Sequence, residues 1–223
     1  NLTFVRRLIS TKKVDINKSN RAGQNPLLIS TMIEDGSMIV RLLQCHPLLN
    51  PNCQNEIGET PLVNAIRYRN SDSVEALLEN PNTDPNFVGK QGNFPFLEAV
   101  KSGNKRIIFA FLNNNKTNLC VSDDQNSNAV HFAILSGDIE IIEMVLEIDG
   151  IDIKQKSEEY DTPLEMVLKN PNIQIASILV QKIEDNLSQI PEDELTSSDI
   201  EQRNICTAMS QLIDVFGSMN SSN

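Results

Sequence analysis

The sequence is poor in the residue types on which most enzymes and metal proteins depend. Its 223 residues include no tryptophan, two histidines and four cysteines, and aromatic residues make up 4% of the chain. The cysteines have no Cys-x-x-Cys pair and no metal-ligand spacing, so free thiols in a reducing compartment are expected. No phosphate-binding loop, dinucleotide fingerprint or EF-hand is present. We therefore expect no catalytic, cofactor-binding or metal-binding residues and no enzyme activity.

Long apolar runs are also missing, and the charge is uneven. No run approaches the length of a membrane-spanning helix. The net charge is −11. Residues 1–50 are net basic, residues 51–140 are slightly acidic, and residues 141–223 carry most of the acidic excess. This balance argues against binding to nucleic-acid phosphates and favours solvated surface or a basic partner in the C-terminal half.

What the sequence does contain is a repeated unit. The stretch from His131 to Leu146 has two short apolar helices, separated by the polar break Ser136-Gly137-Asp138. Neither helix is long enough to be stable alone in water. Copies of the unit recur about every 34 residues, which is typical of a stacked helical repeat. The positions that begin the five copies are Pro26, Pro61, Pro95, Ala129 and Pro163.

Several motifs in phase with this period resemble those of ankyrin repeats. The Thr-Pro-Leu motif of that family is matched at Thr60 and Thr162, and Asn25-Pro26-Leu27 is a close variant. Val130-His131-Phe132-Ala133 matches the Leu-His-x-Ala part of the family motif. The turn glycine stands three residues before the proline in the first three copies, at Gly23, Gly58 and Gly92. The resemblance covers about residues 1 to 182.

The resemblance implies an all-α fold. We expect an ankyrin-repeat solenoid of helix-turn-helix units with short β-hairpin fingers, in five repeats plus a partial one at the N-terminus. Residues 1–182 would form the repeat domain, residues 183–197 an acidic linker, and residues 198–217 a C-terminal capping or docking helix.

Four positions depart from the family pattern. Phe94 stands where Thr usually caps a helix, so the hydroxyl hydrogen bond should be missing there. Asn126 and Tyr160 replace the turn glycine of the fourth and fifth fingers, and Asn tolerates the positive φ angle better than most residues. Lys154 replaces the usual Asn of the fifth finger.

The C-terminal helix should begin with a capping box, Ser198-Asp199-Ile200-Glu201, and end at Gly217. We expect it to pack on Ile175, Ile178 and Leu179, because a terminal repeat otherwise exposes apolar surface. Docking to another protein is the alternative. The side chains expected to make the contact are Ile200, Ile205, Met209, Leu212, Ile213 and Phe216.

The resemblance also indicates a binding surface. His131 occupies a position that usually bonds to backbone between neighbouring repeats, so its expected role is structural. In ankyrin repeats the fingers and first helices line a concave surface that typically holds a partner. Arg and Tyr are enriched among binding hot spots, so Arg67 and Tyr68 are the strongest single candidates. The positions carried over are Arg21, Gln24, Met32, Ile33, Glu56, Ile57, Glu59, Arg67, Tyr68, Lys90, Gln91, Asn93, Lys101, Asp124, Gln125, Leu135, Glu158, Glu159 and Asp161.

The function implied is a non-catalytic protein–protein interaction module. The alternative is the targeting domain of a larger enzyme or secreted pathogen effector whose active domain lies outside this chain. In either case the partner would be another protein, without nucleic acid or membrane, and the chain would be a monomer. The expected location is intracellular and cytoplasmic; a nuclear location, or the host cytosol for an effector, is also compatible.

Overall fold

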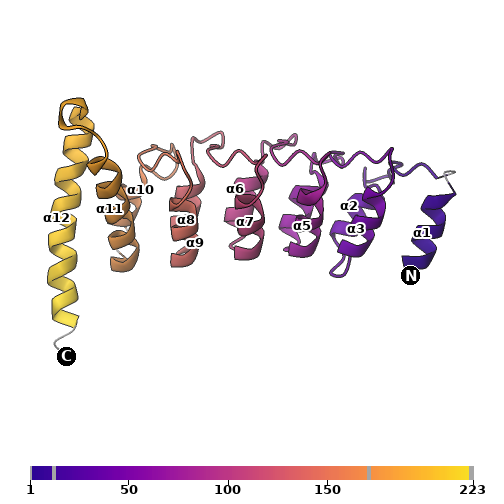
Figure 1. Cartoon of the computed structure of the whole chain (residues 1–223), viewed down its shortest axis with the longest axis horizontal. Helices are drawn as coiled ribbons and strands as arrows, with labels where there is room; N and C mark the ends of the chain where they lie inside the picture. Colours follow the sequence, from indigo (N-terminus) through magenta and orange to yellow (C-terminus); the bar gives the residue numbers. More distant parts are fainter. Residues whose placement is uncertain (1, 12–13, 170–171, 221–223) are drawn as a thin grey trace. The chain divides into compact units, whose positions relative to one another are not determined.

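The computed structural model describes residues 2–11, 14–169 and 172–220, with the side chains of residues 214–220 outside the description. In this part of the chain it contains helices and turns but no β-strand (Figure 1). This confirms the predicted all-α repeat fold, but the described fingers, expected as short β-hairpins, are turns without strands. The chain divides into two compact units, residues 1–124 and 125–223.

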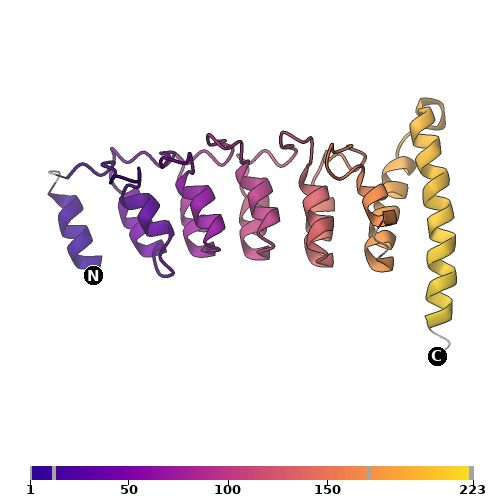
Figure 2. The same ribbon diagram turned by 180° about the vertical axis from the view of Figure 1, so that it is seen from behind.

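The first unit holds one unpaired helix and three helix pairs, and the second holds two pairs and a long final helix (Figure 2). In the first unit the helices are α1 (Leu2–Ser10), α2 (Pro26–Thr31), α3 (Ser37–Gln44), α4 (Pro61–Arg67), α5 (Ser71–Glu79), α6 (Pro95–Lys101) and α7 (Lys105–Leu112). In the second unit they are α8 (Ala129–Ser136), α9 (Ile139–Leu146), α10 (Pro163–Lys169), α11 (Ile173–Ser188), the short 3-10 helix η1 (Glu192–Glu194) and α12 (Ser197–Asn220).

Helices pack in two rows within the first unit. The first helices of the pairs contact one another in the order α2, α4, α6, and the second helices in the order α1, α3, α5, α7. Buried side chains such as Leu28, Ile66 and Phe96 fill the space between the rows. The rings of Phe96 and Phe111 join the two helices of the third pair, with centroids 6.1 Å apart. Helices this short are stable only because each buries its apolar face against its neighbours.

Asparagine side chains connect each turn of the first unit to the next. Asn52 Nδ2 donates to the carbonyl of Asn82 at 2.9 Å, and its Oδ1 accepts from the backbone N–H of Asp84 at 2.9 Å. Asn86 makes the same pair of bonds one repeat later, to Lys116 and Asn118. Asn17 does so one repeat earlier, to Leu48 and Asn50. Each bridge satisfies backbone groups that a single turn leaves without partners.

Polar caps start most of the helices. Asn25 and Thr60 accept hydrogen bonds from the first turn of their helices, whereas Phe94 makes no such bond, as predicted. The second helices α5, α7, α9 and α11 are capped one period apart by Asn70, Asn104, Asp138 and Asn172. These side chains satisfy N–H groups that an α-helix cannot pair internally.

In the second unit α8 packs on α10, and α9 on α11. The fully buried His131 joins the two pairs. Its Nδ1 lies 3.2 Å from the backbone nitrogen of Asn128, completing a capping box, and its Nε2 lies 3.1 Å from the carbonyl oxygen of Asp161 in the next finger. The expected structural role of His131 is confirmed.

The two fingers without a turn glycine use different residues to turn. Asn126 adopts a φ of 59°, which confirms that Asn replaces glycine in the fourth finger. In the fifth finger Tyr160 stands at the position of the turn glycine, but the next residue, Asp161, takes the left-handed conformation with a φ of 63°. Asp tolerates this region better than a bulky aromatic residue. The finger is closed by an isolated bridge between Ser157 and Asp161.

The C-terminal segments differ from their predicted bounds. A linker was expected from residue 183, but α11 continues to Ser188 because Ile183 and Leu187 are both buried. The capping box of α12 is formed by Thr196 and Asp199, two residues before the predicted one, with mutual bonds of 2.9 and 3.2 Å. The helix passes Gly217 and ends at Asn220.

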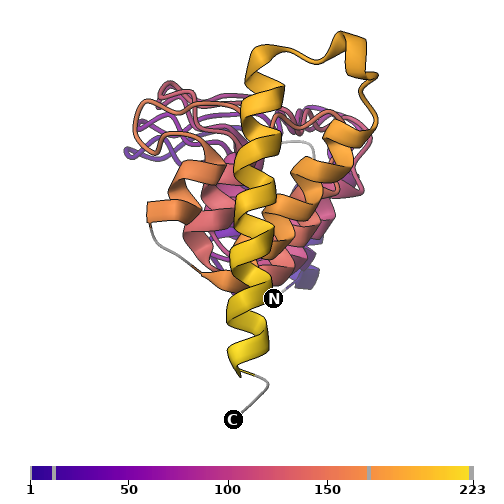
Figure 3. The same cartoon turned by 90° about the vertical axis from the view of Figure 1, so that its left-hand side faces the viewer.

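Helix α12 packs along α11 with a narrower face than predicted (Figure 3). Met209 is buried and Ile205 and Ile213 are half-buried, but Ile200 and Leu212 are exposed, and the side chain of Phe216 lies outside the described part of the chain. Of the expected contacts on α11, Ile175 and Leu179 are buried, whereas Ile178 lines a cavity with residues of α9. The buried stripe of α12 is Asp199, Cys206 and Met209, a spacing that keeps one side of a helix.

Lys154, which replaces the usual Asn, binds this helix. Its ammonium group forms an ion pair with the carboxylate of Asp199, and this pair, together with bonds from Thr196, holds the pKa of Asp199 well below its usual range. The fifth finger is thereby connected to the start of α12, while Ser210 Oγ bonds to Glu184 of α11 at 3.2 Å further along.

We expect His131→Ala to lower the free energy of unfolding by about 1–3 kcal/mol, because it leaves buried partners without their hydrogen bonds. Denaturant unfolding of the purified chain measures the change. His46→Ala is the control. The side chain of His46 accepts one hydrogen bond, from the backbone N–H of Leu48 at 3.3 Å in an exposed loop, so its loss should reduce the free energy of unfolding by less. Loss of partner binding at an unchanged melting temperature would contradict the structural role.

We expect deletion of residues 196–223 to lower the melting temperature and promote association, because it uncovers the side of α11 on which α12 packs. In the full chain, Met209→Asp should reproduce part of the loss, since burying one such side chain contributes about 1.5–3 kcal/mol. Exposed Ile200→Asp is the matched control. Calorimetry and light scattering provide the measurements. A truncated chain that stays monomeric with the same melting temperature would make α12 a docking helix.

Candidate functional site

The predicted surface of the first unit is built from finger tips and from the C-terminal ends of first helices. The exposed tips carry Arg21, Glu56, Ile57, Lys90 and Gln91, and Asp124 is exposed at the end of the unit.

Gln24 and Asn93 are half-buried at the bases of the fingers. The amide of Gln24 points to Met32 Sδ at 3.6 Å, and Asn93 Nδ2 donates to Gln91 Oε1 at 3.1 Å. These two positions support neighbouring side chains and expose little of their own surface.

A row of alternating charges crosses the first unit. Arg67 pairs with Glu59 and lies 3.6 Å from Glu98, measured from Nε to Oε2. Lys101 lies 3.5 Å from Glu98 and 3.9 Å from Asp123, measured from Nζ to the nearest carboxylate oxygen. We call these five residues, Glu59, Arg67, Glu98, Lys101 and Asp123, the charged row. Its carboxylates neutralise its two cations, Arg67 and Lys101.

This arrangement changes how two predicted contact residues are interpreted. Glu59 was expected to face a partner, but it is only 8% exposed, because Arg67 and Asn55 hold its carboxylate inward. The guanidinium of Arg67 is already engaged by two carboxylates, so a partner would have to compete with them. Tyr68 has no such ion pair to compete with and is 52% exposed.

Tyr68 lies beside two other predicted residues. Met32, Ile33 and Tyr68 line a cavity of about 480 Å³ together with polar side chains of the α4–α5 turn. Arg106 closes one side of this cavity, bound to Glu75 at 2.7 Å and to Asp72 at 2.6 Å. The hydrogen bonds from those two carboxylates raise the pKa of the Arg106 guanidinium. The cavity thus combines an apolar side with a closed ionic rim.

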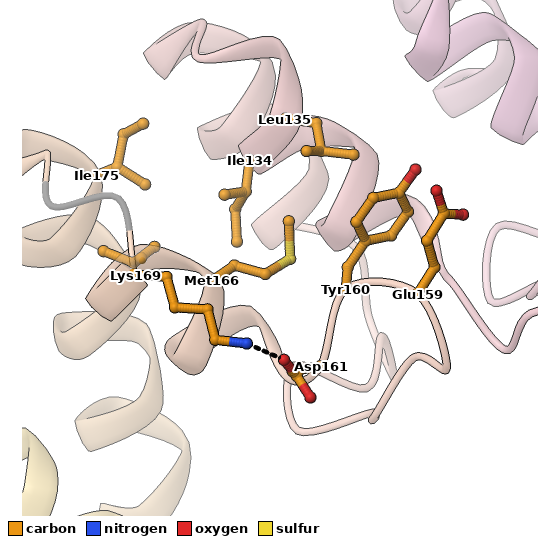
Figure 4. Close-up of a pocket in the computed structure, with 9 residues that line it drawn as sticks. Ile134, Leu135, Glu159, Tyr160, Asp161, Met166, Lys169 and Ile175 are labelled. Atoms are coloured by element: carbon orange, nitrogen blue, oxygen red, sulfur yellow. Dashed lines mark hydrogen bonds and ion pairs between the residues drawn. The ribbon is translucent and has the colours of Figure 1, made fainter.

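In the second unit, Leu135 and the fifth finger form a separate cavity of about 340 Å³ (Figure 4). Leu135 is 53% exposed, and Glu158 and Glu159 are exposed on the finger. Asp161 pairs with Lys169, which lowers the pKa of the carboxyl group and raises that of the ammonium group. Gln125 is exposed, and its carbonyl accepts from the backbone N–H of Glu158 at 2.9 Å.

Several residues of these surfaces were missed from the sequence. Glu98 and Asp123 complete the charged row, and Tyr160 and Met166 line the second cavity. A signal existed for Glu98, since it stands three residues before Lys101 on one helix face. The other contacts depend on how successive repeats are stacked, which no local pattern reveals.

In the part of the chain that the structure describes, no group of three or more His, Cys, Asp or Glu side chains is placed to hold a metal ion. None of the helices in the same described ranges combines the length and apolar character needed to cross a bilayer.

The fold and these surfaces define a helical-repeat solenoid. The family model described as ankyrin repeats (3 copies) matches residues 1–88 and 81–157, and the chain belongs to the ankyrin-repeat family. Ankyrin repeats generally mediate protein–protein interactions. No protein of curated function matches the chain.

Solved structures that are similar to this chain include two ankyrin-repeat proteins. One is the ankyrin repeat domain of Bcl-3, described as a unique member of the IkappaB protein family, with a TM-score of 0.73 and 18% sequence identity. The match covers 82% of this chain and 81% of the Bcl-3 chain. EF0377, an ankyrin repeat protein, has a TM-score of 0.73 at 18% identity, covering 81% of this chain and 92% of its own. At this identity the likeness shows the fold alone.

We expect Glu98→Gln to lower the free energy of unfolding by up to about 1 kcal/mol, because it leaves Arg67 and Lys101 facing each other without the carboxylate between them. The loss should shrink in about 1 M salt, where exposed charges are screened within about 3 Å. Glu56→Gln, on an exposed finger tip, is the control and should change little. Denaturant titrations at low and high salt make the comparison. A larger loss at high salt would contradict an electrostatic origin.

Proposed function

We propose that the chain is a non-catalytic module that binds another protein through its fingers and the ends of its first helices. The observation that carries this is the cluster of Met32, Ile33 and Tyr68, which line one cavity although Ile33 and Tyr68 are largely exposed. Single exposed apolar residues are ordinary, but a group around a concave site is typical of an interaction surface. The charged row beside the group would act as a polar rim.

The remaining features fit a monomeric, intracellular binder. In the described part of the chain the structure shows no disulfide between the four cysteines, as expected in a reducing compartment. The net charge of −11 disfavours nucleic-acid phosphates as the ligand and favours a protein.

The proposal predicts that Tyr68→Ala weakens partner binding at least tenfold, or about 1.4 kcal/mol, because Tyr is a frequent hot-spot residue. The partner is captured with the intact chain, identified by mass spectrometry, purified, and titrated against each variant by calorimetry. Phe109→Ala is the matched control, since Phe109 is 61% exposed on a second helix, α7. If Phe109→Ala abolished binding while Tyr68→Ala left it unchanged, the interface would lie on the second helices and the proposal would be refuted.

A further inference from the structure

The second unit has its own preformed cavity, between α8, α10 and the fifth finger (Figure 4). Ile134, Met166, Val167 and Ile175 contribute its apolar lining, and the exposed Leu135 and the ring of Tyr160 stand beside them. Its volume of about 340 Å³ lies at the lower end of the range for ligand sites. A cavity of this size suits one or two side chains better than a large cofactor.

The walls of this cavity are held in place before anything binds. The ring of Tyr160 meets that of Phe132 edge to face, with centroids 6.2 Å apart and an angle of 80° between the planes. The backbone N–H groups of Glu159 and Tyr160 both donate to Ser157 Oγ, at 3.0 and 3.1 Å. Since the finger is already ordered, binding would cost little conformational entropy.

The charge at the rim is unbalanced. Lys169 is neutralised by Asp161, so this cation is already occupied. The carboxylates of Glu158 and Glu159 are exposed on the same finger, and among the described residues the structure pairs neither with a basic side chain. Glu159 lines the cavity itself. An apolar floor therefore lies next to an anionic edge.

We propose that this cavity binds a segment of a partner protein in which an apolar side chain such as Leu, Ile, Met or Phe is adjacent to a Lys or Arg. The apolar side chain would enter between Leu135 and Met166, and the basic side chain would pair with Glu159. The inference rests on the proposed function and names the chemistry of a partner at the fifth finger.

A random peptide library displayed on phage, panned on the intact chain, tests the proposal. We expect the enriched peptides to share an apolar residue next to Lys or Arg. A synthetic peptide of that sequence should bind at least tenfold more weakly to Leu135→Asp, by fluorescence polarisation. Panning on Glu159→Lys should select acidic residues at the position where the natural chain selects basic ones.

Matched controls lie in the same unit. Leu168→Asp alters a residue that is exposed on α10 but does not line this cavity, and Glu143→Lys reverses an exposed charge on α9. Neither should change peptide binding. Thermal melting identifies a variant that fails to fold; the milder Leu135→Ala then replaces Leu135→Asp.

Three results would overturn the inference: no enriched sequence, enriched peptides that bind Leu135→Asp as tightly as the natural chain, or an unchanged preference on Glu159→Lys. A variant in the first unit distinguishes failure of this inference from failure of the proposed function. If Tyr68→Ala weakens binding of the captured partner while Leu135→Asp changes nothing, the chain binds a protein and only the fifth-finger site is wrong.

Discussion

The whole structure depends on neighbouring repeats completing one another. The helices of the repeats are too short to be stable alone, and the turn between two repeats leaves backbone groups that it cannot pair itself. The constant period solves both problems, because it places apolar faces such as those of α4 and α6 in contact and brings each Asn of the series Asn17, Asn52 and Asn86 beside the backbone of the following turn. At the corresponding position of the fifth finger, Lys154 has no further repeat to meet and instead pairs with Asp199 of α12.

The exposed surface follows from the same register. In the first unit, cations and carboxylates of successive repeats alternate and neutralise one another, so Arg67 and Lys101 contribute little free charge. The apolar group around Tyr68 remains as the accessible feature. In the second unit the charge balance is different. Asp161 forms an ion pair with Lys169, and the carboxylates of Glu158 and Glu159 remain exposed. Each unit thus combines an apolar cavity with a different electrostatic rim.

The sequence alone predicted much of the fold and less of the site. The helices followed from the period and from the Pro and Gly positions, and the roles of His131 and Asn126 followed from local chemistry. The extension of α11 was missed because Glu184 and Asp185 suggested a linker, whereas burial of Ile183 and Leu187 outweighs that polar composition. Glu59 and Arg67 were placed correctly in the repeat, yet their mutual pairing depends on side-chain contacts that sequence spacing does not specify.

Nearest-neighbour packing also determines how the second unit would respond to mechanical force. Helix α12 is bound along one side, by α11 and the Lys154–Asp199 pair. A pull applied at its C-terminal end would load these contacts a few at a time, as in peeling, and the ion pair near the start of the helix would bear the load last. The helix would detach turn by turn from its C-terminal end, and Lys154 would mark the point where this peeling ends.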